Sequence, residues 1–565
     1  MHHEMGWSLP ISTTLSEPAG TISSMQIKRL NWVAVAGPVV TIAFSPTLTY
    51  EPFDNIKLLL LGVFAGIGLS RFITRFKDNR SKQLRVLAAS VALFYFALLI
   101  PMFFSQAPLS QQIFGVAGRS LGFLHYFFLG LILLGALTET RDSAISNFLK
   151  GLTLTGLFEA FYGILQYLKL DPINWENENN WVFGTFGNPN FLSAFVGISV
   201  SASLFIYFQN QSSRWKLLNV SNVVLGTTMA ALSDSIQGLV LIAVSVAMLV
   251  MVSTFIKSKL LGITFSVAGA LSFVVAILGI FQIGPLTRFL YQDSTSFRGD
   301  YWRAGIAMVK ENLFTGVGLD SYGDYYRQFR DATAGQRRGL DIYSDSAHNL
   351  FIDLAATGGL LLLISYLFIN ILVVISIFRT IKASDQLKIE SLALPIIWLT
   401  FQIQTLISIN VSSLAIWGWI TAGLILSQST FSDSKTTDVG RGRVKKSKPK
   451  NGLIAATLAI VFMLLVFPLL RNDLRLGSAL KSTNSNDLIS TVSSWPRSCY
   501  LMAKAEEAYS EAGAPDLALQ ISLKSVESNP RCFDSWRHIS KNPNATKDQQ
   551  EEAFSRMHAL DPLLN

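Results

Sequence analysis

The strongest constraint on the fold is a series of apolar runs, each near 20 residues long, that recurs from the N-terminal third to about Leu470. About 20 apolar residues in an α-helix cross the roughly 30 Å hydrocarbon core of a bilayer. Half of the residues are hydrophobic and 15% are charged, whereas soluble globular chains carry about 25% charged residues. The chain is therefore expected to be an all-α, polytopic membrane protein.

Thirteen segments are candidate spans, so about 12–13 transmembrane helices are expected. They lie near residues 30–48, 56–72, 85–104, 118–138, 147–168, 189–208, 217–233, 238–256, 260–282, 350–378, 392–410, 412–428 and 452–470. The first contains Gly37-Pro38, a pair that interrupts regular helices, and the two segments around Asn410 are crowded together.

Basic residues are concentrated in every second loop between these segments. The loop after the second segment holds a run of them between Arg71 and Arg85, and the loop after the twelfth holds Arg441–Lys450. Intervening loops, such as residues 51–54, are neutral or acidic. Cytoplasmic loops carry the excess of Lys and Arg. The net charge of +9 is therefore a sign of topology, and no aromatic-basic motif points to nucleic acid as a partner.

This topology divides the chain into parts on either side of the bilayer. The N-terminus is expected in the cytoplasm and the chain beyond Arg471 on the outer side. The parts are a cytoplasmic tail (1–27), a multi-spanning membrane domain (28–430) that includes a large extracytoplasmic loop (283–347), a basic cytoplasmic linker (431–451), a last transmembrane helix (452–470) and a small extracytoplasmic helical tail (471–565).

The tail has a repeat of about 34 residues. Pro496 is followed 34 residues later by Pro530 and then, after 32 more, by Pro562, with alanine-rich helical patterns between them. This period is typical of tetratricopeptide repeats, which are stacked helix pairs. A tail of this kind either docks on the membrane domain or binds a protein partner.

The two cysteines of the chain, Cys499 and Cys532, both lie in this tail. An extracytoplasmic tail is in an oxidising space, where adjacent repeats could bring the two thiols together as a disulfide. Two small buried core residues are the alternative. No cysteine spacing typical of a metal site occurs.

The loop 283–347 departs from the charge pattern, because it is arginine-rich although it is expected outside. Its aspartates could pair with the arginines on a solvated face, or arginines such as Arg298 and Arg303 could bind an anionic headgroup. Residues 299–313 have helical spacing, with Trp302 and Arg303 on different stripes. Such a helix lies on the membrane surface or belongs to a folded loop with its own small core.

His348 is the histidine expected at an outer boundary between water and membrane, and Asn349 follows it. An imidazole there can accept a proton from a sugar hydroxyl or donate a hydrogen bond to a phosphate. A histidine that only bonds backbone groups at a helix start is the alternative. Two other outer turns carry amides that could bind carbohydrate or phosphate, with Asn188 and Asn190 in the first and Gln237 in the second.

Together these segments resemble the O-antigen ligase and polymerase superfamily over roughly residues 181–363. The resemblance is carried by Gly184-Thr185-Phe186-Gly187-Asn188-Pro189-Asn190, Ser233–Gly238, Arg298-Gly299-Asp300-Tyr301-Trp302, Gly316-Val317-Gly318, His348-Asn349 and Gly358-Gly359. The tail also resembles the tetratricopeptide extension of some members.

The resemblance implies a GT-C-like membrane glycosyltransferase of the bacterial inner membrane. Such enzymes take a glycan from a polyprenyl (undecaprenyl) pyrophosphate carrier at the outer face and pass it to lipid A-core, another glycan or a protein hydroxyl. Arg298 would match the loop arginine that binds the pyrophosphate, and His348 the essential histidine. Many ligases have a Ser-Arg-Gly turn where this chain has Ser233–Gly238, so Gln237 would replace that arginine as a neutral donor.

The chemistry agrees with this implication, because guanidinium groups can neutralise a pyrophosphate leaving group with bidentate hydrogen bonds. No cofactor and no metal site are expected, although the aspartates of the loop leave a metal-assisted variant open. Two other functions remain as alternatives. One is a transporter or transport accessory, as some relatives are linked to bicarbonate accumulation, and the other is a non-catalytic assembly protein that acts through its tail.

Overall fold

The computed structural model is helical, with no β-strand among the residues that it describes. It describes residues 31–78, 81–175, 182–209, 211–281, 283–284, 293–339, 341, 343–383, 389–431, 449–481 and 485–564. The predicted all-α class is confirmed. The predicted cytoplasmic tail (1–27) and most of the basic linker (431–451) lie outside these residues.

Each of the thirteen predicted spans contains a helix. These helices are α1 (Trp32–Ile42), α2 (Asp54–Asp78), α3 (Lys82–Phe104), α5 (Phe123–Ala136), α6 (Asp142–Tyr167), α7 (Pro189–Ile206), α8 (Ser213–Leu232), α9 (Gln237–Lys257), α10 (Lys259–Ile280), α15 (Leu350–Lys382), α16 (Ala393–Thr405), α17 (Ser412–Phe431) and α18 (Pro449–Lys481).

Within the described ranges, eight of these helices are long and apolar enough to cross a membrane, by length and composition: α2, α3, α6, α7, α9, α10, α15 and α18. The helices α1 and α5 are apolar but shorter. The last helix, α18, continues to Lys481, past its expected end at residue 470. The chain is a polytopic membrane protein.

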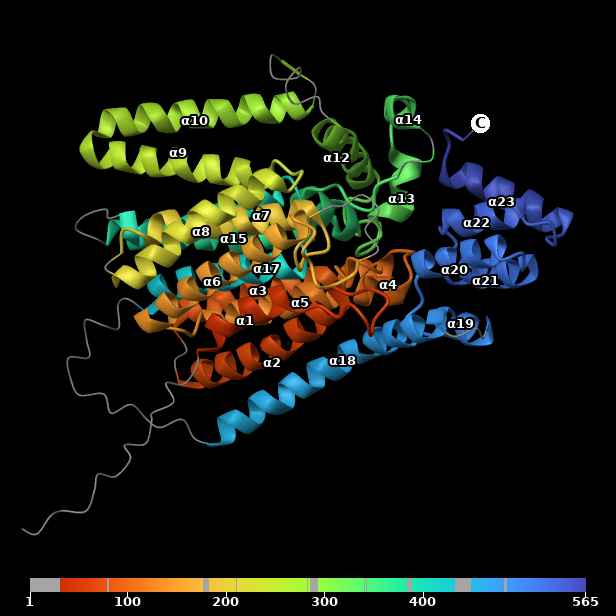
Figure 1. The fold of residues 1–565 in the computed structure, drawn as a ribbon, viewed down its shortest axis with the longest axis horizontal. Helices are drawn as coiled ribbons and strands as arrows, with labels where there is room; N and C mark the ends of the chain where they lie inside the picture. The colour runs from red at the N-terminus through yellow and green to blue at the C-terminus, as the bar shows by residue number, and fades with distance from the viewer. Residues whose placement is uncertain are drawn as a thin grey trace, which may run out of the picture.

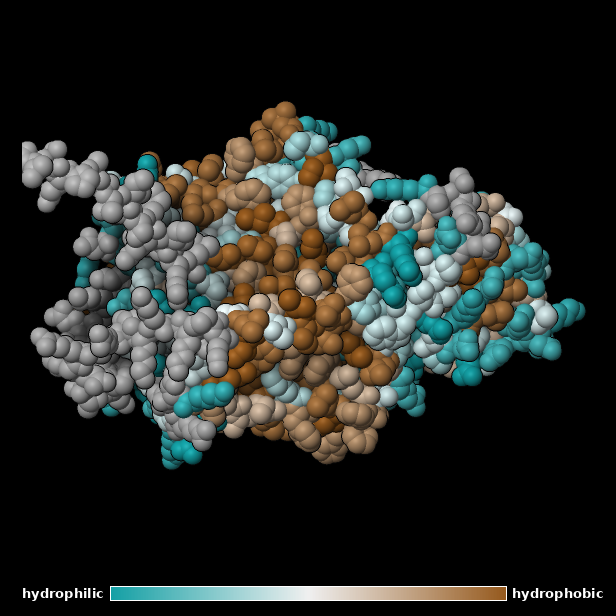
Figure 2. All heavy atoms as spheres, turned by 90° about the horizontal axis from the view of Figure 1, so that it is seen from below, coloured by the Kyte–Doolittle hydropathy of each residue, from teal (hydrophilic) through white to brown (hydrophobic). Residues whose placement is uncertain are grey.

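Burial separates inner helices from outer ones. In α7, 83% of the most apolar stretch is buried inside the protein, against 11% in α10 and in α18. Leu260 on α10 is 75% exposed. Exposed apolar side chains on the outer helices suit a lipid environment, where they need no protein partner. Figure 2 shows apolar residues gathered over the middle of the molecule and polar residues gathered at the end that holds the tail.

The long helix α15 is broken at Gly359, whose φ of 78° lies in the left-handed region. The break frees backbone groups, and the turn 313–318 of the loop 283–347 pairs with them. Val317 N–H donates to the Ala356 carbonyl at 2.8 Å, and Leu360 N–H donates to the Leu313 carbonyl at 2.8 Å. The two glycine motifs of the sequence, 316–318 and 358–359, therefore meet and fix the loop on α15.

The described part of the loop 283–347 is folded around a small core, to which Ile280 of α10 and Ala356 of α15 also contribute. It contains α12 (Asp293–Glu311), α13 (Tyr322–Phe329) and α14 (Ala332–Arg338). Trp302 and Met308 from α12 pack with Tyr322 and Tyr326 from α13, all of them buried. The structure thus favours a folded loop over helices that lie with their apolar faces on the membrane.

The tail consists of α19 (Ser485–Val492), α20 (Cys499–Glu511), α21 (Pro515–Ser528), α22 (Phe533–Lys541) and α23 (Lys547–Leu560). The helix α20 packs against α21, and α22 packs against α23. A disulfide joins Cys499 to Cys532. Helix pairs agree with the period of about 34 residues, and the assignment to tetratricopeptide repeats stays a prediction. The tail lies at the same end of the bundle as α12, α13 and α14 (Figure 1).

Candidate active site

Arg298 is a buried arginine on α12, only 8% exposed. Within the described part of the chain it forms no hydrogen bond and no ion pair with a carboxylate. Burial lowers the pKa of Arg298 to about 10, and the nearby Tyr301 opposes that shift. The guanidinium remains protonated at neutral pH. The site therefore keeps a buried positive charge that no carboxylate of the described residues pairs with.

His348 lies in an unusual backbone conformation just before α15. Its φ of 51° is in the left-handed region, which costs a non-glycine residue about 1–3 kcal/mol. Three hydrogen bonds support this conformation. His348 N–H donates to Ser346 Oγ at 2.9 Å, the Ser346 hydroxyl donates to Asp353 Oδ2 at 2.8 Å, and Ala347 N–H donates to Asp353 Oδ1 at 2.7 Å. These bonds hold the backbone on both sides of His348 in place.

Tyr301 links Arg298 to His348. Its ring stacks on the His348 imidazole, with centroids 5.4 Å apart and planes 25° from parallel. Tyr301 also lies close enough to Arg298 for its charge to act on the guanidinium. The loop and the start of α15, some fifty residues apart in sequence, thus bring the two predicted catalytic residues to one place.

Asp345 lies between His348 and Arg119. Arg119 Nε donates to Asp345 Oδ2 at 2.8 Å. Burial by itself would raise the pKa of Asp345, but the charges of Arg119 and His348 outweigh it and hold that pKa below its usual value. Asp345 is therefore ionised at neutral pH, and its negative charge acts on the imidazole.

A short loop after α4 (Leu109–Phe114) carries Arg119 to this position. Asp320 anchors the loop, because its Oδ2 accepts Val116 N–H at 2.7 Å and Leu121 N–H at 3.2 Å. Burial raises the pKa of Asp320 to about 6. Arg119 and Asp345 both line a cavity of about 540 Å³, whose walls also include residues of the tail but not Arg298, Tyr301 or His348.

Residues 221–367 match the family model described as O-antigen ligase. This match supports the resemblance of the chain to the O-antigen ligase superfamily over these residues. No curated protein matches the chain. The matched stretch runs from α8 to the second part of α15 and includes Arg298 and His348 together with Gln237. Asn188 and Asn190 lie before it.

The other predicted residues within the matched stretch contact protein groups. Arg303 pairs with Asp300 and, at 2.8 Å, with Asp331, and Trp302 is buried against Phe281. Asn349 caps α15 by accepting Phe351 N–H at 3.0 Å. These contacts explain the residues structurally, and their roles in substrate binding stay predictions.

Gln237 lies at the start of α9, on a different part of the domain. It is buried, and its Oε1 has no hydrogen-bond partner among the described residues. The neighbouring Gly238 packs against Ser193 of α7, with its N–H donating to Ser193 Oγ at 3.1 Å. The contacts of this turn are therefore with α7, and none of them joins Gln237 to Arg298 or His348 in the described structure.

The segment 184–190 is built over charged groups inside the membrane domain. Thr185 donates its hydroxyl to Glu159 at 2.6 Å, and Lys57 donates to the Thr185 carbonyl. Asn188 caps α7 by accepting Asn190 N–H at 2.9 Å, and its side chain lines the 540 Å³ cavity. Lys57 and Glu159 were absent from the predicted site, although ionisable residues within apolar spans are a signal that could have found them.

Tyr301, Asp345 and Arg119 were also missed by sequence reasoning. The first two lie inside or beside motifs that the sequence had already singled out, and Asp345 stands three residues before His348. Arg119 lies 226 residues before its partner Asp345, and no local pattern marks it. Among the described residues, no group of three or more His, Cys, Asp or Glu is arranged to hold a metal ion.

Proposed function

We propose that this chain is a membrane glycosyltransferase that transfers or polymerises a glycan from a polyprenyl pyrophosphate donor at the outer face of the bacterial inner membrane. The observation that carries the proposal is the buried Arg298, with no carboxylate partner among the described residues, joined through Tyr301 to His348. An uncompensated buried cation suits an anionic ligand, and an adjacent imidazole suits proton transfer.

In this proposal Arg298 holds the pyrophosphate leaving group. As the bond between the anomeric carbon and the phosphate oxygen breaks, the electron pair stays on that oxygen and negative charge grows there. A guanidinium already fixed in a buried site stabilises this charge more than water would, because it needs no reorganisation. Removal of one such donor costs about 100- to 1,000-fold in rate in other enzymes.

His348 acts as the general base in the same step. It takes the proton of the acceptor hydroxyl while the hydroxyl oxygen forms the new bond to the anomeric carbon, which gives inversion at that carbon. Asp345 stabilises the imidazolium that results, and Arg119 holds Asp345 in place. The donor thereby loses its glycan to a lipid, glycan or protein acceptor, and polyprenyl pyrophosphate is released.

The arrangement of α18 supports an outer location for the site. A continuous helix of 33 residues spans about 50 Å at 1.5 Å per residue, which exceeds the thickness of the hydrocarbon core. Its start follows the basic linker and its end enters the tail. If the linker is cytoplasmic, as the positive-inside rule predicts, the tail and the loop that it contacts lie outside.

The test is the cellular pool of polyprenyl-pyrophosphate-linked glycan in the native host, with wild-type protein and with His348→Ala at matched abundance. His558→Ala, on α23 of the tail, is the matched control. The proposal expects the pool to rise and one surface glycan to disappear in His348→Ala alone. An unchanged pool with intact surface glycans would reject the proposal and direct attention to solute uptake.

A further inference from the structure

The cavity of about 540 Å³ lies where three parts of the chain meet. The membrane domain contributes Arg119 and Asn188 to its wall, the extracytoplasmic loop contributes Tyr343, and the tail contributes Tyr500 and Asp534. This volume is within the range of small-ligand pockets, about 300–1,000 Å³. The tail therefore supplies part of the wall of a ligand-sized space beside the candidate active site.

Buried ion pairs hold the tail against the loop. Asp561, at the end of the tail, is fully buried and pairs with Arg330 at 2.6 Å and with Arg327 at 3.5 Å. Arg537 adds a more exposed pair with Asp341 at 3.1 Å. Buried charges are costly to separate from their partners, so the tail is seated firmly on α13 and the segment that follows it.

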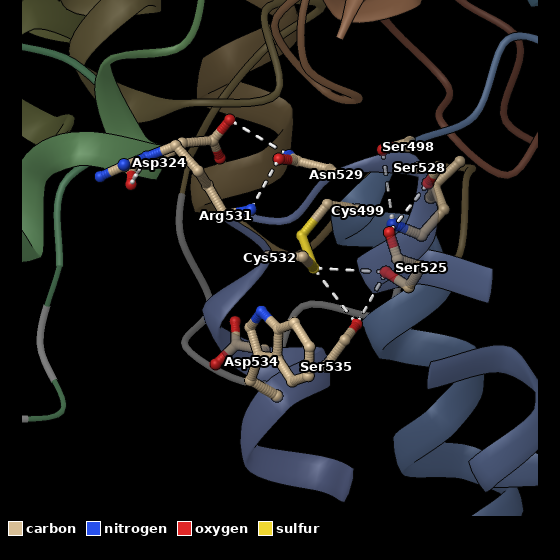
Figure 3. The surroundings of a disulfide bond; sticks show 12 residues. Asp324, Ser498, Cys499, Ser525, Ser528, Asn529, Arg531, Cys532, Asp534 and Ser535 are labelled. Carbon is tan, nitrogen blue, oxygen red and sulfur yellow. Dashed lines mark hydrogen bonds between the residues drawn. A yellow bond between two sulfur atoms is a disulfide. The ribbon is translucent and has the colours of Figure 1, made fainter. Parts of the chain in front are cut away.

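A second set of contacts surrounds the disulfide (Figure 3). Asn529 donates to Asp324 at 3.2 Å, and the Arg531 guanidinium lies 3.5 Å from the centre of the Tyr325 ring. The Cys499–Cys532 bond ties the start of α20 to the turn before α22. Two of the tail segments that line the cavity, 496–501 and 531–534, lie beside the two cysteines of this bond.

The side chains of the wall do not suit a polyanion, because its arginines already bind protein groups. The lining includes six carboxylates, namely Glu51, Asp54, Asp324, Asp345, Asp473 and Asp534, and four arginines, namely Arg119, Arg327, Arg497 and Arg531. Each arginine already donates a hydrogen bond within the protein. Arg119 donates to Asp345 and Arg327 donates to Asp561. Arg497 donates to the Ser493 carbonyl and Arg531 donates to Gln328. Arg298 is therefore a better binding group for pyrophosphate than the arginines of this wall. The cavity suits a neutral ligand that is rich in hydroxyl groups.

Exposed tyrosines on two walls fit the same kind of ligand. Tyr343 on the loop is 46% exposed and Tyr500 on the tail is 41% exposed. Tyr343, Asp345, Tyr500 and Asp534 all line this one cavity. Tyrosine offers an apolar ring face and a polar tip, and carboxylates and amides bind hydroxyl groups.

From these observations we infer that the cavity is a glycan-binding site and that the tail forms one of its walls. The inference rests on the proposed transferase function, because the bound glycan would belong either to the lipid-linked donor or to the acceptor. Arg119 and Asp345 belong both to the cavity wall and to the candidate active site. A glycan seated in the cavity thus reaches Asp345, whose charge acts on the His348 imidazole.

The test measures binding by full-length protein in detergent. The probes are neutral oligosaccharides released by mild acid from the native host's own surface polysaccharides. The variants are Tyr343→Ala/Tyr500→Ala and the control Phe554→Ala, a tail residue that is 55% exposed and does not line the cavity. Two lost ring contacts predict about tenfold or greater weakening for the double variant, with wild-type binding in the control.

The outcomes separate this inference from the proposed function. If His348→Ala leaves the lipid-linked pool unchanged while the double variant still loses binding, the glycan site stands and the transferase proposal fails. If wild-type protein retains none of the oligosaccharides, or the double variant binds as wild type does, the inference is overturned. In transfer assays, a raised KM for the lipid-linked donor or for the acceptor identifies which glycan occupies the cavity.

Discussion

Arg298 and Arg303 lie five residues apart on α12, and their surroundings predict opposite consequences of substitution. Arg298 is buried without a carboxylate partner in the described structure. Its charge costs solvation energy that no such contact offsets, so Arg298→Ala should leave thermal stability unchanged or slightly raised. Because the same charge is proposed to stabilise the leaving group, transfer should slow by about 100- to 1,000-fold.

Arg303→Ala should show the reverse pattern. Its guanidinium bonds Asp300, whose side chain is 1% exposed, and Asp331, whose side chain is 36% exposed. Removal of a partner from a buried polar group costs about 1–3 kcal/mol. The thermal midpoint should therefore fall, while the transfer rate per folded molecule stays near the wild-type rate.

The assay combines two measurements on the same preparations. Release of polyprenyl pyrophosphate from purified lipid-linked glycan is followed in proteoliposomes, and thermal unfolding is followed by intrinsic tryptophan fluorescence. Arg298→Lys should fall between wild type and Arg298→Ala, because lysine keeps the charge but lacks the planar fork. Equal rate losses in Arg298→Ala and Arg303→Ala would refute the assignment of different roles.

Two further predictions concern the frame of the site. Gly359→Ala puts a side chain at φ 78°, where its Cβ would clash with the Phe314 carbonyl. The substitution should lower the free energy of unfolding by about 1–3 kcal/mol. Limited proteolysis should cut residues 313–318 faster than in the control Gly269→Ala, whose added Cβ meets open space. Burial raises the pKa of Asp320 to about 6, above its unfolded value near 3.9, so the folded state binds more protons between pH 6 and 4. Its contribution to stability should rise as the pH falls through this range. Asp320→Asn should flatten that rise, and parallel curves of thermal midpoint against pH would contradict the reasoning.

The sequence predicted most of the architecture because membrane spans are specified locally. A run of apolar residues is sufficient to form a helix in lipid, where every backbone group must be paired within the segment. All thirteen expected segments contain helices. The separation of inner from outer helices was not predicted, because α7 and α10 both qualify as membrane spans by length and composition although 83% of the apolar stretch of α7 and 11% of that of α10 is buried.

The site was predicted only in part. Arg298 and His348 could be selected because an arginine-rich turn and a boundary histidine stand out against apolar surroundings. Trp302 and Arg303, from the same turn, were selected by the same signal, and the structure surrounds them with protein contacts. Residue type and spacing do not distinguish an arginine that pairs with aspartates from one that does not.

By itself, the sequence determined that this protein is an all-helical membrane protein, where its helices lie, and that its polar groups gather in one loop and one tail. Those properties depend on the hydrophobicity of neighbouring residues. Tertiary structure alone decided that Arg119 reaches Asp345 and that Asp561 reaches Arg330, more than 200 residues away in each case. Such contacts depend on how separate helices pack, because the two partners of an ion pair can lie far apart in the sequence. No local sequence pattern then identifies the pair.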